Sequence, residues 1–225
     1  MVIAVDGPAG AGKSTVCRLL AERLGYTYLD TGSMYRAAAW GFIQEGLRSE
    51  EEFKISMALD RLPLHFCIEN GSLTILYGEK RLDEEIRPPE ISRMASRVSQ
   101  LSAVREFMMD WQRRLAEKGN VVAEGRDMGT VVFPETPFKI YLTADLATRA
   151  RRRFLEYQSK RIPVEYAALE EQIRERDKAD EERALAPLRP SPEAFVLDTS
   201  DMSISDVVDR VLEHIREKEE WSCQG

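Results

Sequence analysis

A chain of 225 residues with 43% hydrophobic and 32% charged residues is long enough for one α/β domain with insertions, and no apolar run approaches the roughly 20 residues of a membrane span. The formal net charge of −7 argues against an extended nucleic-acid surface. Three scattered cysteines suggest neither a disulfide framework nor a zinc site, so we expect a cytoplasmic protein.

The first predicted element is a strand over residues 1–5, which a glycine-rich loop joins to a helix over 13–24. The loop follows the pattern G-x-x-x-x-G-K-S, and with the threonine after it comprises Gly7, Pro8, Ala9, Gly10, Ala11, Gly12, Lys13, Ser14 and Thr15. Glycines let backbone N–H groups approach an anion, and the positive end of the helix dipole points at the same place. Lys13 would reach the β- and γ-phosphates and Ser14 would hold Mg²⁺, so the pattern predicts a nucleoside triphosphate site rather than a connection that binds nothing.

A short strand over 26–29 leads into a second predicted helix, over 30–44, which Thr31 or Ser33 can cap. Arg36 is expected in the first turn of this helix, where the helix dipole disfavours a cation. A positive charge at such a place favours an anionic ligand over a surface salt bridge.

Residues from about 41 to 95 read as a small insert in the parent fold. A polar helical patch precedes two strand-like runs, over 62–68 and 73–77, and Asn70-Gly71 between them is typical of a hairpin turn. We expect a small antiparallel sheet here, followed by two helices that end near residue 118.

The second half of the chain alternates strands and helices. Val121-Val122-Ala123 is a buried strand that runs into Gly125-Arg126-Asp127, and ligands of open α/β sheets bind at such carboxyl ends. Further strands are predicted over 138–142 and 194–197, and helices from 145 to a break at 158–163, over 164–182 and over 203–218. Five short parallel strands with helices between them predict a doubly wound, three-layer α/β fold.

Arginines occur at several separate places in this pattern: Arg36, Arg126, Arg149, Arg152, Arg153, Arg176 and Arg183. Phosphoryl transfer between two anions needs such charges, because arginine binds phosphate through two hydrogen bonds at once. We find neither an apolar run ending in a Walker-B aspartate nor a guanine-reading motif, both of which are typical of switches and motors. The broken helical hairpin at about 154–166 is suited to be a mobile lid.

Four stretches, GPAGAGKST, LDTGSMYR, EGRDMGTVVFP and RERDKADEERALAPL, together resemble bacterial cytidylate kinases over nearly the whole chain. The resemblance implies a P-loop kinase fold with a five-stranded parallel sheet, an NMP-binding insert at about 41–95 and a helical lid. It also implies transfer of the γ-phosphoryl group of ATP, with Mg²⁺, to CMP or dCMP.

The family pattern also implies roles for individual residues. The acceptor phosphate would be bound by Arg36 and Arg126, with Thr31 in the same pocket. The cytosine edge would be read by Ser96, Arg105 and Asp127, and the sugar hydroxyl would be held by Asp180 and Arg183. The lid and the transition state would be served by Arg149, Arg153 and Arg176. An ionised Asp127 can accept from the exocyclic amine of cytosine, whereas uracil would set a carbonyl against it. Glu124, where the motif usually has Asp, and Thr31, where Ser is common, keep the chemical group.

Two other readings stay open at this point. One is a kinase for another small acceptor, such as UMP or shikimate, and the other is a nucleotide-dependent switch that acts on a partner protein. In the leading reading the protein is a monomer that binds small molecules and neither nucleic acid nor membrane.

Overall fold

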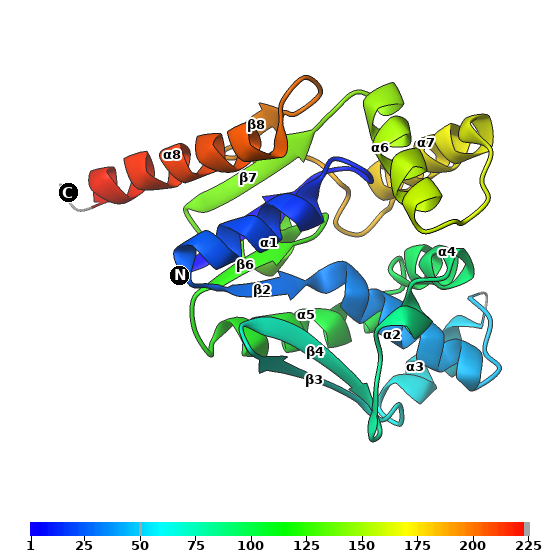
Figure 1. Cartoon of the computed structure of the whole chain (residues 1–225). Helices are drawn as coiled ribbons and strands as arrows, with labels where there is room; N and C mark the ends of the chain where they lie inside the picture. Colours follow the sequence, from blue (N-terminus) through cyan, green and yellow to red (C-terminus); the bar gives the residue numbers. More distant parts are fainter. Residues whose placement is uncertain (50, 223–225) are drawn as a thin grey trace. The chain divides into compact units, whose positions relative to one another are not determined.

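The computed structural model describes residues 1–49 and 51–222, and the chain divides into two compact units, which are described separately below (Figure 1). The first unit comprises Met1–Leu24 and Val122–Gly225, and the second comprises Gly25–Val121. The predicted insert at 41–95 lies inside the second unit.

The first unit is built on strands in the order β6 (Val121–Glu124), β1 (Val2–Asp6), β7 (Phe138–Thr143) and β8 (Phe195–Asp198). β7 pairs in parallel with both β1 and β8, as the alternation of strands and helices predicted. Ile3, Ala4 and Val5 of β1 are fully buried, which is the continuous apolar pattern of a parallel strand inside a core.

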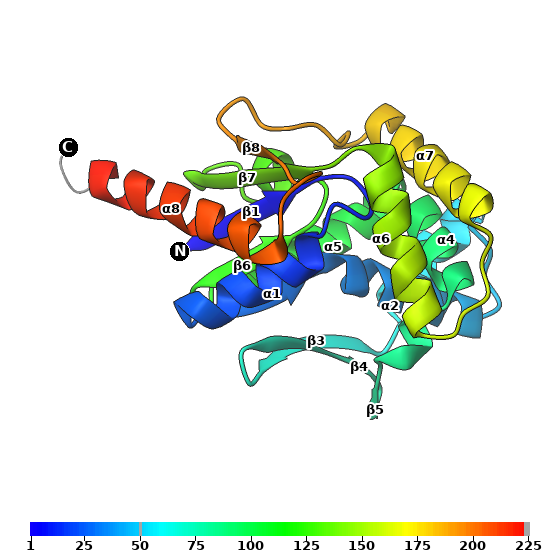
Figure 2. The same ribbon diagram turned by 45° about the horizontal axis from the view of Figure 1, so that its top comes forward.

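Four helices accompany these strands: α1 (Lys13–Leu24), α6 (Leu146–Ser159), α7 (Tyr166–Glu182) and α8 (Ile204–Ser222). α1 buries the stripe Val16, Cys17, Leu20 and Ala21, and it packs beside α8 (Figures 1 and 2). α6 and α7 form a hairpin with a small core of its own around Ala150, Leu169 and Ile173, and the break predicted at 158–163 falls between them.

A short helix that the sequence analysis missed follows β6. It is η2 (Met128–Val132), a single π-type turn. The N–H groups of Val132 and Phe133 donate to the carbonyls of Asp127 and Met128, at 3.1 and 2.7 Å. Such turns are rare and are frequently found at functional sites.

The second unit contains, in chain order, β2 (Thr27–Asp30), α2 (Thr31–Gln44), α3 (Glu52–Leu59), β3 (Leu64–Glu69), β4 (Ser72–Tyr77), β5 (Lys80–Arg81), η1 (Glu84–Ile86), α4 (Pro89–Val98) and α5 (Ser102–Ala116). β3, β4 and β5 pair antiparallel, which confirms the predicted hairpins. Asn70 and Gly71 have φ of 50° and 71°, as the predicted Asn-Gly turn requires. β4 also pairs in parallel with β2, so the small antiparallel sheet is joined to β2.

The helices of the second unit begin and end close to their predicted bounds. α5 buries Val104, Met108 and Leu115, and Trp111 on the same face packs edge-on against Phe66 of β3. The predicted cap of α2 was wrong, because the carboxylate of Asp30 accepts from the Ser33 N–H at 2.9 Å. The side chain of Asp30 therefore satisfies one of the free donors at this helix start.

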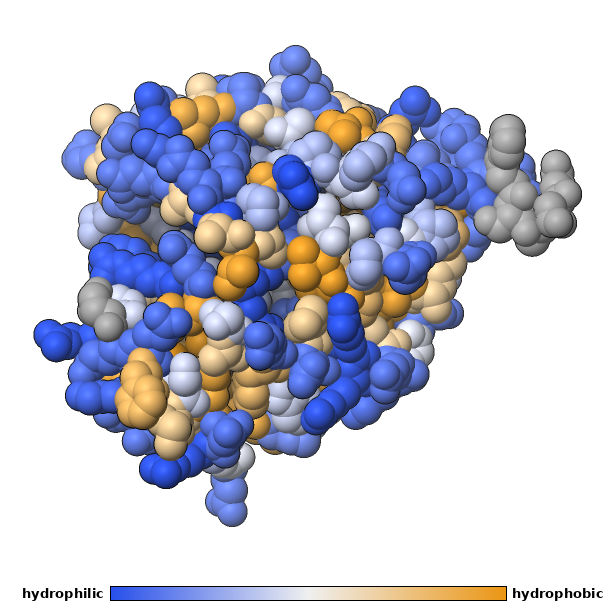
Figure 3. Space-filling view, turned by 180° about the vertical axis from the view of Figure 1, so that it is seen from behind, coloured by the Kyte–Doolittle hydropathy of each residue, from blue (hydrophilic) through white to orange (hydrophobic). Residues whose placement is uncertain are grey.

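The surface agrees with the composition. The face in Figure 3 carries hydrophilic residues over most of its area, and hydrophobic residues stand among them in small groups. Within the described part of the chain, every helix is too short or too polar to cross a bilayer.

The backbone at Gly7 generates a prediction about stability. Its φ is +145°, and a Cβ at this position would lie 1.9 Å from the carbonyl oxygen of Leu142. We expect Gly7→Ala to lower the free energy of unfolding by about 3 kcal/mol or more, because the loop must move away from β7. Denaturant titration followed by circular dichroism measures this change.

Gly46→Ala is the matched control, since Gly46 has φ of +70° with nothing within 4 Å of its Cβ position. Gly46→Ala should lower the free energy of unfolding by only about 1 kcal/mol, because the cost is the strain of an alanine with left-handed backbone angles. If the two variants lose equal free energy of unfolding, the close approach of Gly7 to β7 does not exclude a side chain at this position.

Candidate active site

The phosphate loop leaves the carboxyl end of β1 and ends in α1, as its sequence pattern predicts. Gly10 and Gly12 have positive φ angles, +78° and +87°, which glycine adopts without strain. Lys13 is 6% exposed, and its Nζ donates to the carbonyls of Gly7 and Pro8 at 2.8 and 2.7 Å. Burial, with the charge of Arg126, lowers the pKa of Lys13 to about 7.

Ser14, at the start of α1, is tied to the end of β6. Its Oγ donates to Oε2 of the buried Glu124 at 3.0 Å. A hydroxyl beside a carboxylate is a donor set that suits Mg²⁺, which takes few protein ligands and keeps water and phosphate oxygens for the rest.

Glu124 is the residue that the sequence analysis noted where the family motif usually has Asp. The apolar strand Val121–Glu124 does end in a carboxylate beside the phosphate loop, but the residue is glutamate.

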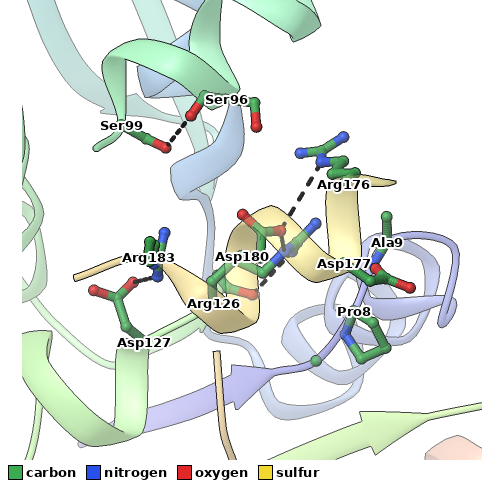
Figure 4. Close-up of polar contacts among 12 residues, drawn as sticks. Pro8, Ala9, Ser96, Ser99, Arg126, Asp127, Arg176, Asp177, Asp180 and Arg183 are labelled. Carbon is green, nitrogen blue, oxygen red and sulfur yellow. Dashed lines mark hydrogen bonds and ion pairs between the residues drawn. The ribbon is translucent and has the colours of Figure 1, made fainter. Parts of the chain in front are cut away.

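Arg126 lies two residues after Glu124 in the chain and forms an ion pair with Asp180 of α7, with Nε and Oδ2 3.0 Å apart (Figure 4). Nε of Arg176 lies 4.0 Å from the same oxygen. Burial by itself would raise the pKa of Asp180, but the charges of Arg126, Arg176 and Arg183 outweigh it and lower that pKa. The structure therefore brings two of the predicted arginines, Arg126 and Arg176, to one carboxylate, with the charge of Arg183 near enough to act on it.

Asp127 and Arg183 form a second buried pair, 3% and 8% exposed. Nη2 of Arg183 lies 3.8 Å from Oδ1 of Asp127, and its Nε donates to the carbonyl of Ala186 at 2.5 Å (Figure 4). The charge of each side chain is thus balanced inside the protein.

Three of the arginines of α6, Arg149, Arg152 and Arg153, have different surroundings. Arg149 is buried: it donates to the carbonyls of Ala144 and Ala9 at 2.8 and 3.1 Å, and it pairs with Asp177. Asp177 in turn accepts from the Ala9 N–H at 3.3 Å, so this pair braces the phosphate loop. Arg152 donates to Thr199, whereas Arg153 reaches Glu156 at 3.2 Å and lies over the Tyr157 ring.

The remaining predicted residues belong to the second unit. Thr31 is buried as the first residue of α2, and Arg36 is its sixth, so the prediction that Arg36 lies in the first turn was wrong. Arg36 forms an ion pair with Asp30 at 3.2 Å and donates to the Ser33 hydroxyl. The salt bridge that the sequence analysis disfavoured is therefore present.

Ser96 on α4 and Arg105 on α5 both contact Ser99. The Ser99 hydroxyl donates to the carbonyl of Ser96 at 2.8 Å, and Nη1 of Arg105 donates to the carbonyl of Ser99 at 3.3 Å. Figure 4 shows the contact between Ser96 and Ser99.

Sequence reasoning also missed Asp6 and Asp177. Asp6 is 4% exposed and accepts from the N–H groups of Met128 and Gly129, and burial raises its pKa to about 6. Nothing in the local sequence marks either aspartate, because Asp6 binds residues more than 100 positions away and Asp177 binds Ala9, 168 positions away, and Arg149, 28 positions away.

Two solved structures share the fold of this chain. A gluconokinase from Sinorhizobium meliloti 1021 aligns with a TM-score of 0.52 at 17% identity, covering 100% of this chain and 97% of the gluconokinase. An uncharacterized protein from Eubacterium ventriosum aligns with a TM-score of 0.55 at 12% identity, covering 96% and 98%. At these identities the likeness shows the fold alone, and it confirms the predicted α/β class.

Comparison of the sequence with known proteins identifies the family as well as the fold. The family model described as cytidylate kinase matches residues 3–217. A cytidylate kinase from Carboxydothermus hydrogenoformans is 44% identical over 218 residues, which cover 97% of this chain and 98% of that protein. One from Pseudomonas aeruginosa strain LESB58 is 45% identical, covering 98% and 96%. A family model over residues 3–217 and relatives at about 45% identity show the family: the chain belongs to the cytidylate kinase family.

Proposed function

We propose that this protein transfers the γ-phosphoryl group of ATP, with Mg²⁺, to CMP and dCMP, giving ADP and CDP or dCDP. The observation that carries the proposal is the continuity from Glu124 to Asp127. Glu124 contacts Ser14 of the phosphate loop, and the next residues include Arg126 and the Asp127–Arg183 pair. One short segment thus links the groups suited to the donor with those suited to an acceptor nucleotide.

The donor half consists of the phosphate loop and its magnesium ligands. The backbone N–H groups and Lys13 would bind the β- and γ-phosphates of ATP, for which Lys13 would turn from the carbonyls of Gly7 and Pro8. Ser14 and Glu124 would hold Mg²⁺. When bound, the ion neutralises charge that develops on the phosphate oxygens.

The acceptor half draws on arginines and carboxylates. Arg126 and Arg36 would bind the phosphate of CMP, near Thr31, and Asp180 with Arg183 would bind the sugar hydroxyl. The ion pairs that the three arginines make with Asp30, Asp127 and Asp180 hold the guanidinium groups in place before the nucleotide arrives. The lid and the stabilisation of the negative charge of the transition state are assigned to Arg149, Arg153 and Arg176.

Recognition of the base is assigned to Asp127, Ser96 and Arg105. The cytosine amine donates to a carboxylate, and its ring nitrogen and carbonyl accept from a hydroxyl and a guanidinium. Burial of Asp127 strengthens this discrimination, because a uracil carbonyl facing a buried carboxylate would have no partner.

Several features remain predictions from the sequence. They are the single domain over 1–225 with its NMP-binding insert at about 41–95 and lid at about 154–166, the monomeric state, the cytoplasmic location and the use of dCMP as well as CMP.

The acceptor specificity is tested by mixing the purified protein with MgATP and CMP, dCMP, UMP or AMP in turn. We expect CMP and dCMP to give the largest kcat/KM, with ADP formed in equal amount to the nucleoside diphosphate. A better acceptor outside this pair would reject the proposal. ATP hydrolysis that no monophosphate changes would favour the nucleotide-dependent switch.

Lys13→Ala tests the donor half. We expect kcat to fall about 10²–10³-fold, the usual effect of losing one donor that stabilises transition-state charge. The unfolding temperature is the control, because among the described residues the hydrogen bonds of the Lys13 side chain go to carbonyls of the phosphate loop. A rate near that of the wild type would contradict the assignment of the loop.

Asp127→Asn and Ser96→Ala test the reading of the base. Asparagine keeps the shape of Asp127 but puts a donor where the cytosine amine needs an acceptor. We therefore expect kcat/KM for CMP to fall about tenfold or more while UMP is affected less. Equal losses for CMP and UMP would mean that these residues do not read the base.

A further inference from the structure

Asp6 is the last residue of β1 and immediately precedes the phosphate loop. Its side chain is buried, and its two carboxylate oxygens accept from the N–H groups of Met128 and Gly129, each at 2.8 Å. Both distances are those of strong hydrogen bonds to a charged acceptor. One carboxylate therefore joins the end of β1 to a segment more than 100 residues away in the chain.

The two N–H groups that Asp6 binds are the first two of η2. A helix start leaves such groups without partners inside the helix. Among the described residues, the residue before η2, Asp127, makes no side-chain capping bond of the ordinary kind. Asp6 thus supplies the cap of η2 from another strand.

The same segment is held to β1 at a second point, because the Gly125 N–H donates to the Val5 carbonyl at 3.0 Å. Residues 126 and 127 lie between these two attachments. Hydrogen bonds to β1 therefore fix the backbone on both sides of these two residues. The fixed backbone in turn sets the directions in which the side chains of Arg126 and Asp127 point.

We propose that Asp6 is a positioning residue for acceptor recognition: by capping η2 it sets the orientation of Asp127 and Arg126 toward the nucleotide that receives the phosphoryl group. The inference rests on the proposed function, which gives these two residues to CMP. Asp6 itself touches no substrate in this account.

Asp6→Asn is the direct test, because asparagine has one acceptor oxygen and an amide group that faces the other backbone N–H. One of the two N–H groups of η2 then loses its partner, and Asp127 loses its fixed direction. Removing the charge of Asp6 also makes the surroundings of Lys13 more positive, which favours ATP. If kcat/KM falls for CMP while KM for ATP stays unchanged, the loss is therefore not caused by a change of charge at the ATP site.

The readouts are kcat and KM for CMP, UMP and ATP at pH 8, together with the unfolding temperature. We expect KM for CMP to rise about tenfold and the ratio of kcat/KM for CMP to that for UMP to fall by a similar factor, the size of one lost charge-assisted hydrogen bond. KM for ATP should stay within about twofold of the wild type, as no donor group is changed.

Thr136→Val is the matched control, since the Thr136 hydroxyl donates to the Val2 carbonyl at the opposite end of β1. This variant should lower the unfolding temperature and leave the ratio of CMP to UMP unchanged. If it changes the ratio as much as Asp6→Asn does, loss of stability explains both and the proposal is overturned.

If Asp6→Asn does not fold, Asp6→Glu is the second test of the proposal. Glutamate keeps both acceptor oxygens but displaces them by about 1.5 Å, the length of one carbon–carbon bond. It should also reduce the preference for CMP. A variant of Asp6 that folds and keeps the wild-type ratio overturns the inference, whereas a wild-type protein that prefers another acceptor overturns the proposed function instead.

Discussion

The hydrogen bond between Ser14 and Glu124 is the contact on which the rest of the site depends. It fixes the start of α1 against the carboxyl end of β6, so that a loop from the beginning of the chain meets a motif more than 100 residues later. Open α/β sheets place ligands at such strand ends because the loops there leave the sheet together.

The sequence predicted local features well and long-range partners poorly. The helix over Lys13–Leu24 and the turn at Asn70-Gly71 follow from residues close together in the chain, and both were correct. The cap of α2 was misplaced by one residue or more because Asp30, Thr31 and Ser33 are all competent caps. Asp6 could not be recognised at all, since its function as a cap depends on where the fold brings η2.

Buried charge is the common feature of the candidate site in the first unit. Arg126, Arg149 and Arg183 each pair with an aspartate, and none of these three guanidinium groups is left as an isolated buried charge. Breaking such a pair is expensive inside a protein, so the arginines stay in place before any nucleotide is present. The same argument separates Arg149, which braces the loop at Ala9, from Arg153, which lies half-exposed over Tyr157.

The hairpin of α6 and α7 has its own small core around Ala150, Leu169 and Ile173. Packing of this kind would let the two helices turn together, as the proposed lid requires, without losing their internal contacts. Motion would then concentrate at the ends of the hairpin, where Arg149 and Asp177 meet Ala9. The brace beneath the phosphate loop would thus serve as a pivot, and the arginines carried farther out on the hairpin would travel the longest arcs.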